Sequence, residues 1–319
     1  MSQTTQAYRC NSPVAFLVFN RPDITRRVFL EIAKTKPRTL LIVADGPRPN
    51  RVDDQEQCEA VRKIFEGVDW DCEVLTNYSK ENLGCAVRIS SGIDWVFNNV
   101  EEAIFLEDDC LPHPSFFKFC DEMLKIYRDD ERIMTITGDN FQFGRKRWEY
   151  SYYFSRYVHV WGWASWRRAW KYYDLHMSYW PMISSQGWLY DILGDDREAD
   201  FWTDVFNRAH LGQSGTWDYQ WVFACWLRSA LSIVPNVNLI SNIGFGKNAT
   251  HTGGSSKAAN MAIEEIGFPL AHPPIFIRDS RADSATARLF FHKSPLSHSR
   301  ALIKRLVANV HHKKPNYPC

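Results

Sequence analysis

Short apolar runs alternate with amphipathic stretches over the first 140 residues of the chain. The runs predict strands at residues 14–19, 40–44, 72–75 and 103–106. Since the first, second and fourth runs contain no polar residue, we expect these strands to be buried on both faces. Helical spacing of apolar residues between and after the runs predicts helices with stripes at Cys58, Val61, Phe65 and Val68, at Ile89, Ile93 and Val96, and at Phe116, Phe119, Met123 and Tyr127. The alternation predicts an α/β fold with a Rossmann-like, mostly parallel sheet flanked by helices.

The texture changes after Gly138, where aromatic residues crowd the chain between Trp148 and Trp180. Beyond them, the pattern predicts helices near 199–209 and 217–229 and a strand at 232–240. The glycine-rich segment 244–254 predicts a loop. We therefore expect a second subregion after the first sheet-forming part.

Composition and charge narrow the class of protein. With 319 residues and 45% hydrophobic content, the chain can bury a large core, which excludes fibrous and disordered classes. The 38 basic and 37 acidic residues give a formal net charge of +1, so no global field attracts nucleic acid. We find no leader segment and no run near the roughly 18 apolar residues of a membrane span, and expect a cytoplasmic protein. The eight scattered cysteines predict reduced thiols.

Polar residues follow three of the predicted strands: Asn20-Arg21-Pro22-Asp23, Asp45-Gly46-Pro47-Arg48 and Glu107-Asp108-Asp109. Ligands of open α/β sheets bind at these carboxyl ends. Three consecutive acids repel one another, and Mn²⁺ or Mg²⁺, which prefer carboxylate oxygens, would relieve the repulsion. If the strand stays extended, Glu107 and Asp109 share a face and Asp108 points elsewhere. A cluster of solvated acids before a helix is the simple alternative.

Residues 104–127, IFLEDDCLPHPSFFKFCDEMLKIY, resemble the Glu-Asp-Asp segment of the eukaryotic N-acetylglucosaminyltransferase I type family, which has the GT-A glycosyltransferase fold. In that family too, a buried strand ends in Glu-Asp-Asp and is followed by a proline, two phenylalanines and a helix. The resemblance implies that Asp109 binds the metal in a DXD-like motif, and that Glu107 and Asp108 contact the donor sugar and the ribose. It also implies that Arg21 binds the nucleotide and that Asp45 reads a uracil.

Two later segments extend this resemblance. The segment Thr216-Trp217-Asp218-Tyr219-Gln220-Trp221 is similar to the family's W-D-x-W helix, which implies that Asp218 is the general base. The segment IGFGKNATH at 243–251 is similar to the F-G-R-K-G-x-S-H loop that closes over the donor, although Thr250 replaces the family's serine. There Lys247 is a candidate diphosphate contact, and His251 a metal ligand or a second diphosphate contact. As the alternative for Asp218, an acid in the first turn of a helix is favoured by the macrodipole, with Thr216 as the cap.

The function implied is a metal-dependent, inverting glycosyltransferase of polysaccharide biosynthesis. It would move a sugar from a nucleotide diphosphate donor, UDP by resemblance, to a hydroxyl of a carbohydrate or lipid-linked glycan acceptor. The Mn²⁺ or Mg²⁺ cofactor would neutralise the departing diphosphate, and Asp218 would reach the acceptor hydroxyl within about 3 Å. UDP-N-acetylglucosamine is the donor that the family suggests.

The chain divides accordingly into a disordered N-terminus at 1–10 and a nucleotide-sugar-binding α/β half at 11–140. An acceptor and catalytic half of the same domain follows at 141–275, and a basic tail or helix at 276–319. We expect the tail to pack on the domain; peripheral contact with the inner membrane face is the alternative. Trp163, Trp166 and Trp170 predict the core stripe of a helix. Trp161 and Gly162 precede it, where an indole can stack on a sugar ring that the small glycine admits.

Two other functions remain as alternatives. A sugar nucleotidyltransferase usually has a glycine-rich loop after the first strand, whereas Phe19-Asn20-Arg21-Pro22-Asp23 contains no glycine. The second alternative is a catalytically inactive module that binds a sugar or a nucleotide. Titration with UDP, with and without manganese, distinguishes these alternatives from the transferase. A crystal soaked with both ligands would contradict the metal site if the position at Asp109 were empty or taken by an arginine.

Overall fold

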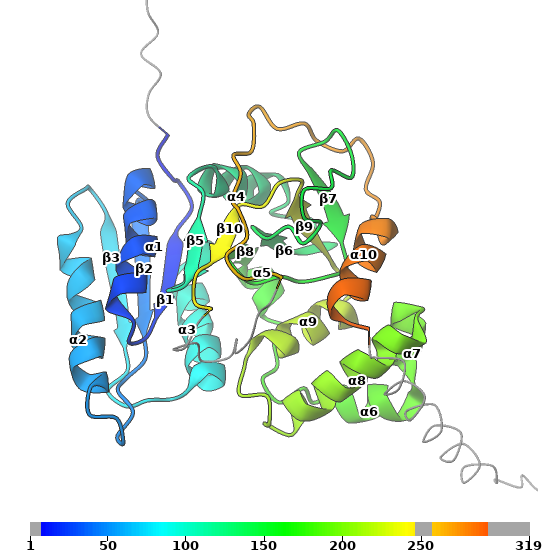
Figure 1. Cartoon of the computed structure of the whole chain (residues 1–319), viewed down its shortest axis with the longest axis horizontal. Helices are drawn as coiled ribbons and strands as arrows, with labels where there is room; N and C mark the ends of the chain where they lie inside the picture. Colours follow the sequence, from blue (N-terminus) through cyan, green and yellow to red (C-terminus); the bar gives the residue numbers. More distant parts are fainter. Residues whose placement is uncertain (1–7, 246–256, 293–319) are drawn as a thin grey trace, which may run out of the picture. The chain divides into compact units, whose positions relative to one another are not determined.

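The computed structural model describes residues 8–245 and 257–292. Within them, one sheet has the strand order β3-β2-β1-β4-β8-β6-β9-β7, and β10 pairs with β5 separately (Figure 1). The strands are β1 (Val14–Val18), β2 (Thr39–Ala44), β3 (Glu73–Tyr78), β4 (Glu102–Glu107), β5 (Cys110–Pro112), β6 (Ile133–Thr137), β7 (Tyr152–Ser155), β8 (Trp163–Trp166), β9 (Leu231–Pro235) and β10 (Ile240–Asn242). The helices are α1 (Pro22–Thr35), α2 (Asp54–Ile64), the 3₁₀ turn η1 (Phe65–Gly67), α3 (Cys85–Asn99), α4 (Ser115–Ile126), α5 (Arg167–Trp170), α6 (Trp180–Gln186), α7 (Trp188–Leu193), α8 (Asp196–His210), α9 (Asp218–Leu227) and α10 (Ser280–Phe290).

Most strands of the large sheet run in one direction. β1 is parallel to β2 and β4, and β2 is parallel to β3. β8 is antiparallel to both β4 and β6, which places β6 in the direction of β4. β9 is parallel to β6, and β7 is antiparallel to β9. The predicted α/β fold with a mostly parallel sheet is confirmed, and the carboxyl ends of β1, β2, β4, β6 and β9 belong to the same edge.

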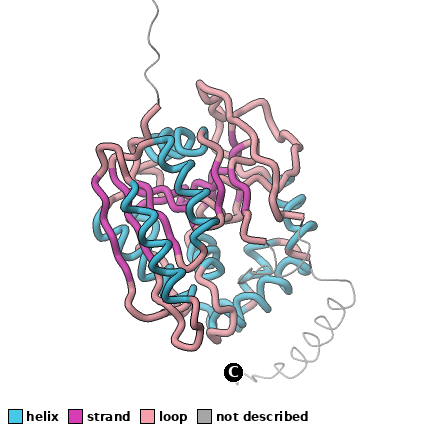
Figure 2. Tube along the Cα trace, turned by 60° about the vertical axis from the view of Figure 1, so that its left-hand side comes forward, coloured by secondary structure: helices cyan, strands magenta, loops and turns pink. Residues whose placement is uncertain are grey.

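Helices cover both faces of this sheet (Figure 2). On one face, Phe16 and Val18 of β1 share a buried cluster with α1, α2 and α4. On the other face, Phe105 of β4 packs on Phe97 of α3 and stacks on Trp163 at 4.5 Å. Each such side chain contributes about 1.5–3 kcal/mol when it leaves water. The strands β1, β2 and β4 are buried on both faces, as their unbroken apolar runs predicted.

The helices begin and end for local reasons. α1 starts with Pro22 in its first turn, where the missing N–H of proline has no cost. It ends at Lys36, which takes the left-handed conformation at φ 46°. Asp195 caps α8 by accepting hydrogen bonds from the backbone N–H groups of Arg197 and Glu198. The helices predicted from apolar stripes in the first half are confirmed as α2, α3 and α4, and the helix expected near 199–209 is confirmed as α8, whereas α1 was not predicted.

Two predictions of secondary structure are wrong. The single strand expected at 232–240 is divided into β9 and β10, because Asn236 and Asn238 hydrogen-bond backbone carbonyls through their side chains and interrupt the pairing. The helix expected at Trp163–Trp170 is the strand β8 followed by the short helix α5. Its three tryptophans are nonetheless core residues, since each is at most 4% exposed.

The described chain divides into two compact units. Among the described residues, the first comprises 8–175, 215–245 and 257–283 and holds both sheets, and the second comprises 176–214 and 284–292. In the second unit, Trp180 donates to Asn207 Oδ1 at 3.0 Å, and Tyr190 donates to Asp200 at 2.7 Å. The rings of Trp202 and Phe291 lie 4.9 Å apart, so the segment 284–292 packs on α8.

The cysteines and the helices bear on two further predictions. Cys10, Cys58, Cys72, Cys85, Cys110, Cys120 and Cys225, the cysteines of the described ranges, are free thiols, as predicted. Among helices in the described ranges, none combines the length and the apolarity that crossing a bilayer requires.

Candidate functional site

The three acids predicted to form the metal site lie where β4 ends. Glu107 is the last residue of β4, and Asp108 and Asp109 form the turn into β5. Arg21, at the start of α1, donates from Nε and Nη2 to Asp108 and from Nη2 to Asp109 at 3.0 Å. The prediction that Asp108 points away from Asp109 is wrong, because the chain turns here and strand alternation no longer applies. The site therefore contains a buried carboxylate, Asp108, and a half-buried one, Asp109, bridged by one guanidinium.

Asp218 reaches these acids from a distant part of the chain, as the first residue of α9. Its charge raises the pKa of Glu107 and that of the Cys85 thiol, so it lies within electrostatic range of both. Cys85 begins α3 and is affected in the same way by Asp45 and Asp109. The fold therefore gathers four predicted site acids around the first turn of α3.

Glu107 is the acid with the largest departure from ordinary titration in this cluster. Burial raises the pKa of Glu107 to about 8, and the charges of Asp109, Asp108 and Asp218 act in the same direction. A hydrogen bond with the Trp217 side chain opposes them. Glu107 is consequently protonated near neutral pH and able to donate a hydrogen bond. Burial also raises the pKa of Asp108, against the lowering effect of Arg21.

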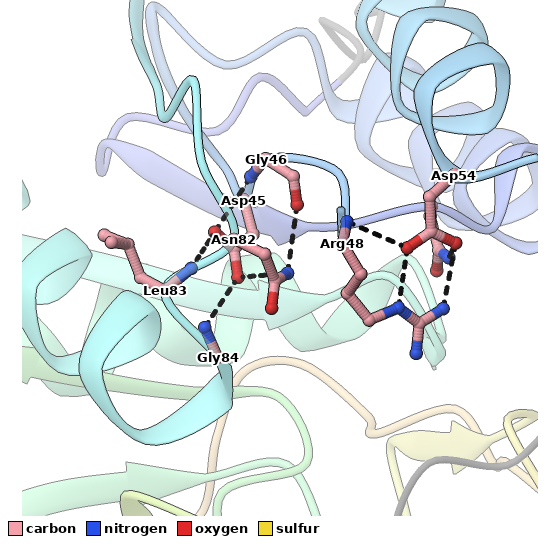
Figure 3. Close-up of polar contacts among 8 residues, drawn as sticks. Asp45, Gly46, Arg48, Asp54, Asn82, Leu83 and Gly84 are labelled. Atoms are coloured by element: carbon pink, nitrogen blue, oxygen red, sulfur yellow. Dashed lines mark hydrogen bonds and ion pairs between the residues drawn. The ribbon is translucent and has the colours of Figure 1, made fainter. Parts of the chain in front are cut away.

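Asp45, predicted to read a uracil, accepts four hydrogen bonds from its own surroundings (Figure 3). Oδ1 accepts from the backbone N–H groups of Gly46 at 2.8 Å and Leu83 at 2.9 Å. Oδ2 accepts from Asn82 Nδ2 at 3.0 Å and from the Gly84 N–H at 3.1 Å. These donors fill the carboxylate's acceptor positions, so Asp45 fixes the loop before α3. Reading a base stays a prediction and requires one of these donors to give way.

Two other polar residues at strand ends hold a helix. Arg48 donates from Nε to Asp54 Oδ2 at 2.6 Å and from Nη2 to Oδ1 at 2.9 Å, and Asn20 Nδ2 donates to Oδ1 at 2.9 Å (Figure 3 draws the Arg48 contacts). Hydrogen bonding by Arg48 lowers the pKa of Asp54 to about 2. Asn20 and Arg48 therefore anchor the start of α2 in this structure.

The chain after β10 lies directly against Asp109. The Ile243 N–H donates to the Asp109 carbonyl at 2.8 Å, and a Cβ at residue 244 would overlap the Asp109 carboxylate. Glycine is required at 244 for this close approach. Lys247 and His251, the predicted diphosphate contact and metal ligand, lie outside the described residues, as does the C-terminal tail from residue 293.

The donor set at Asp109 suits a divalent cation bound jointly with a substrate. Within residues 8–245 and 257–292, no group of three or more His, Cys, Asp or Glu side chains forms a cage for a metal ion. Mg²⁺ and similar ions usually bind through one or two carboxylates, with substrate phosphates and water completing the shell. Asp109 supplies one such carboxylate beside acids whose pKa values mutual repulsion raises. The residues present therefore fit a metal held between Asp109 and a diphosphate, provided that Arg21 yields part of its contact with Asp109.

Two predictions about neighbouring residues are wrong. Thr216 does not cap α9: Trp217 is the cap residue without a side-chain bond, and the Thr216 hydroxyl instead donates to Asp218 Oδ1. Gly162 does not make room for a sugar, because a Cβ there would overlap the side chain of Ile240. The half-buried Trp161 ring lies 5.7 Å from Phe245 in an edge-on contact.

Sequence patterns did not indicate three residues of this region. Cys85 was noticed only as a thiol, and Trp217 only as part of a motif, although one faces the acid cluster and the other bonds Glu107. Asp139 follows β6 and is fully buried. Its Oδ2 accepts from the Trp161 N–H at 3.1 Å, while Oδ1 has no partner among the described residues. The position of Asp139 just after a buried strand was the available signal.

Comparisons with known proteins give distant similarities only. No family model and no curated protein matches the chain. The mannosyltransferase PcManGT from Pyrobaculum calidifontis, in complex with GDP-Man and Mn²⁺, is 16% identical with a TM-score of 0.35, over 50% of this chain and 46% of that one. A UDP-glucose pyrophosphorylase complexed with UDP-glucose is 13% identical with a TM-score of 0.26, over 46% of this chain and 62% of that one. A cytidylyltransferase from Leptospira borgpetersenii serovar Hardjo-bovis is 12% identical with a TM-score of 0.27, over 50% of this chain and 63% of that one. The chain spans less than two thirds of the length of each.

Proposed function

We propose that this protein is a metal-dependent glycosyltransferase with a GT-A type nucleotide-sugar site. It transfers a sugar from a UDP-type donor to a hydroxyl of a glycan, with inversion. Asp109 binds Mn²⁺ or Mg²⁺, and Asp218 is the general base. The observation that supports the proposal best is that Asp218, from α9, lies within electrostatic range of Glu107 at the end of β4, and that the neighbouring Trp217 side chain hydrogen-bonds Glu107.

Each residue has a chemical task in this proposal. A metal at Asp109 would supply Lewis-acid neutralisation of the leaving diphosphate. The guanidinium of Arg21, which is paired with Asp108 and Asp109 in this structure, binds the nucleotide part of the donor. Glu107 contacts the donor sugar, and Asp108, which is paired with Arg21, contacts the ribose. Asp218 accepts the acceptor's proton, for which a half-buried carboxylate at a helix start is suited.

The metal site is tested by titrating the protein with UDP in the presence and absence of Mn²⁺. We expect Asp109→Ala to abolish the enhancement of UDP binding by manganese while the circular dichroism spectrum stays unchanged, because the only predicted carboxylate ligand is removed. Asp71→Ala is the matched control, since that side chain is 93% exposed. Equal enhancement in the wild type and Asp109→Ala would remove Asp109 from the site.

A crystal structure with UDP and Mn²⁺ tests the position of Arg21. We expect the metal on Asp109 and the guanidinium on the nucleotide or on Asp108. A structure in which Arg21 keeps its contact with Asp109 and no metal binds there would overturn the metal-dependent mechanism. Such a result would leave a nucleotide-binding module without transfer activity.

A further inference from the structure

A cleft lies in the first unit, beside the end of β9 and the chain that precedes β7. It has a volume of about 650 Å³, within the range of small-molecule sites. Three stretches of chain line it: residues 146–151, 236–237 and 265–267. None of the residues assigned to the transfer reaction belongs to it.

Trp148 presents a fixed, exposed indole in this cleft. The residue is 55% exposed, which is unusual for so large an apolar side chain. The Nε1–H donates to Asp279 Oδ2 at 3.0 Å, and Arg147 holds the same carboxylate with Nε at 3.0 Å and Nη2 at 3.1 Å. Asp279 also accepts from the Ala282 N–H at the start of α10. The indole is therefore held at its N–H edge while more than half of the residue stays exposed, which suits a stacking platform.

Asn236 places an amide beside this platform. Its Nδ2 donates to the carbonyls of Trp148 and Tyr150, which fixes the orientation of the amide. The Oδ1 atom is buried and has no hydrogen-bond partner within the described chain. Buried polar atoms are rarely left unpaired in native proteins, and this unpaired oxygen belongs to a residue that lines the cleft.

The charges around the cleft leave no excess of cations. Lys146 and Arg147 are accompanied in the lining by Glu149 and Glu265, and Arg147 is already paired with Asp279. A phosphate or nucleotide would require an excess of cations, which this lining lacks. An uncharged ligand with apolar ring faces and many hydroxyls suits this lining, which offers an indole, an amide and charged side chains of both signs.

One stretch of chain, from Asn236 to Ile243, connects the cleft with the proposed transfer site. Asn236 lines the cleft, the Leu239 N–H donates to the Gly138 carbonyl at 2.9 Å, and the Ile243 N–H donates to Asp109. This stretch follows the carboxyl edge of the sheet from β9 past β6 to β4. At about 3.3 Å per residue it spans at most about 23 Å, which a chain of several sugar units can bridge.

We infer that this cleft binds a saccharide chain, with Trp148 stacking on a sugar ring and Asn236 accepting a sugar hydroxyl. Resting on the proposed function, the inference identifies the bound chain as the acceptor, held at a distance from the bond that forms. The acceptor is then an oligosaccharide or a glycan of several units, and single sugars bind weakly.

The test uses the full chain on an array of immobilised linear oligosaccharides that covers common hexoses, N-acetylhexosamines and deoxyhexoses. We expect the wild type to bind at least one series with an affinity that rises with chain length. Trp148→Ala should weaken this binding by about tenfold or more, as loss of a central aromatic anchor does. Trp188→Ala is the matched control, because Trp188 is another exposed tryptophan, 43% exposed, in the second unit.

Trp148→Phe guards against misfolding, since it keeps an aromatic ring and loses only the bond to Asp279; it should bind more tightly than Trp148→Ala. Absence of oligosaccharide binding, or equal binding by the wild type and Trp148→Ala, would overturn the inference. UDP titration with Mn²⁺ on the same samples separates the two claims. UDP binding without saccharide binding refutes the cleft alone, and saccharide binding without UDP binding refutes the transferase alone.

Discussion

Charge and burial oppose each other at the residues of the β4 end. Glu107 is buried among acids and holds a proton near neutral pH, whereas Asp108 is buried against the Arg21 guanidinium. These two adjacent carboxyl groups differ because Asp108 is paired with the cationic Arg21, whereas Glu107 hydrogen-bonds the neutral Trp217 side chain. Such divided environments are typical of sites that handle protons and charged substrates.

Asp218 is the residue whose substitution separates chemistry from binding. We expect Asp218→Asn to keep the affinity for UDP with Mn²⁺ and to lower turnover by about 10²–10⁴-fold, because the amide cannot accept the acceptor's proton. UDP release from the UDP-sugar that the wild type uses measures turnover. Asp191→Asn, at another first helical turn, is the control. Retained turnover in Asp218→Asn would exclude Asp218 as the base.

The burial of Asp139 should make the stability of the folded protein depend on pH. Burial raises the pKa of Asp139 far above its ordinary value, while the unfolded chain releases this proton at about pH 4. Above that pH the folded state binds more protons than the unfolded state, so Asp139 makes the wild type less stable as the pH rises, by at most about 1.4 kcal/mol per unit. Asp139→Asn keeps an acceptor for the Trp161 N–H and removes this loss. Its stability relative to the wild type should increase between about pH 5 and about pH 8 in urea unfolding; a constant difference would contradict the prediction.

At the scale of elements, close approach of backbone segments positions the site. Gly46 allows the β2 end to meet the backbone of Glu81, and Gly244 allows the chain after β10 to meet Asp109. A side chain at either position would displace a loop that carries predicted ligand contacts. Helix α3, whose start faces the acids, is likewise set against the sheet through a glycine.

Gly92 of α3 packs on β2. A Cβ at residue 92 would lie 2.5 Å from Val43 Cγ1, so we expect Gly92→Ala to lower the free energy of unfolding by about 1–3 kcal/mol despite the better helix propensity of alanine. Gly67→Ala is the control, since a Cβ there meets no atom within 4 Å. Urea unfolding measures both variants. A Gly92→Ala protein as stable as the Gly67→Ala protein would show that α3 moves without cost.

At the scale of the whole molecule, the transferase proposal places all of its described site residues in the first unit. A ligand that binds only the native state raises stability by about 2.7 kcal/mol at 100 times its dissociation constant. In calorimetry, UDP with Mn²⁺ should therefore raise the melting temperature of the transition that includes the first unit by a few degrees. The Asp109→Ala protein should show no manganese-dependent rise. A shift of equal size in that variant would place the ligand elsewhere.

The local pattern of side chains determined the α/β class, the buried strands β1, β2 and β4, and the helices α2, α3 and α4, whereas α1 was not predicted. Period-two and period-3.6 repeats reflect burial directly, so they can be read without the fold. The rule that ligands bind at the carboxyl ends of parallel strands also indicated Arg21, Asp45 and the acids from Glu107 to Asp109.

Only the tertiary structure decided which side chains meet. The contact of Arg21 with both Asp108 and Asp109, the saturation of Asp45 by the loop before α3, and the arrival of Asp218 near Glu107 join segments far apart in the chain. The division of 232–240 into β9 and β10, and the packing of the segment 284–292 on α8, also depend on long-range contacts. Periodicity records how each residue faces water, and pairing between distant segments depends on chain turns and side-chain hydrogen bonds that leave no periodic trace in the sequence.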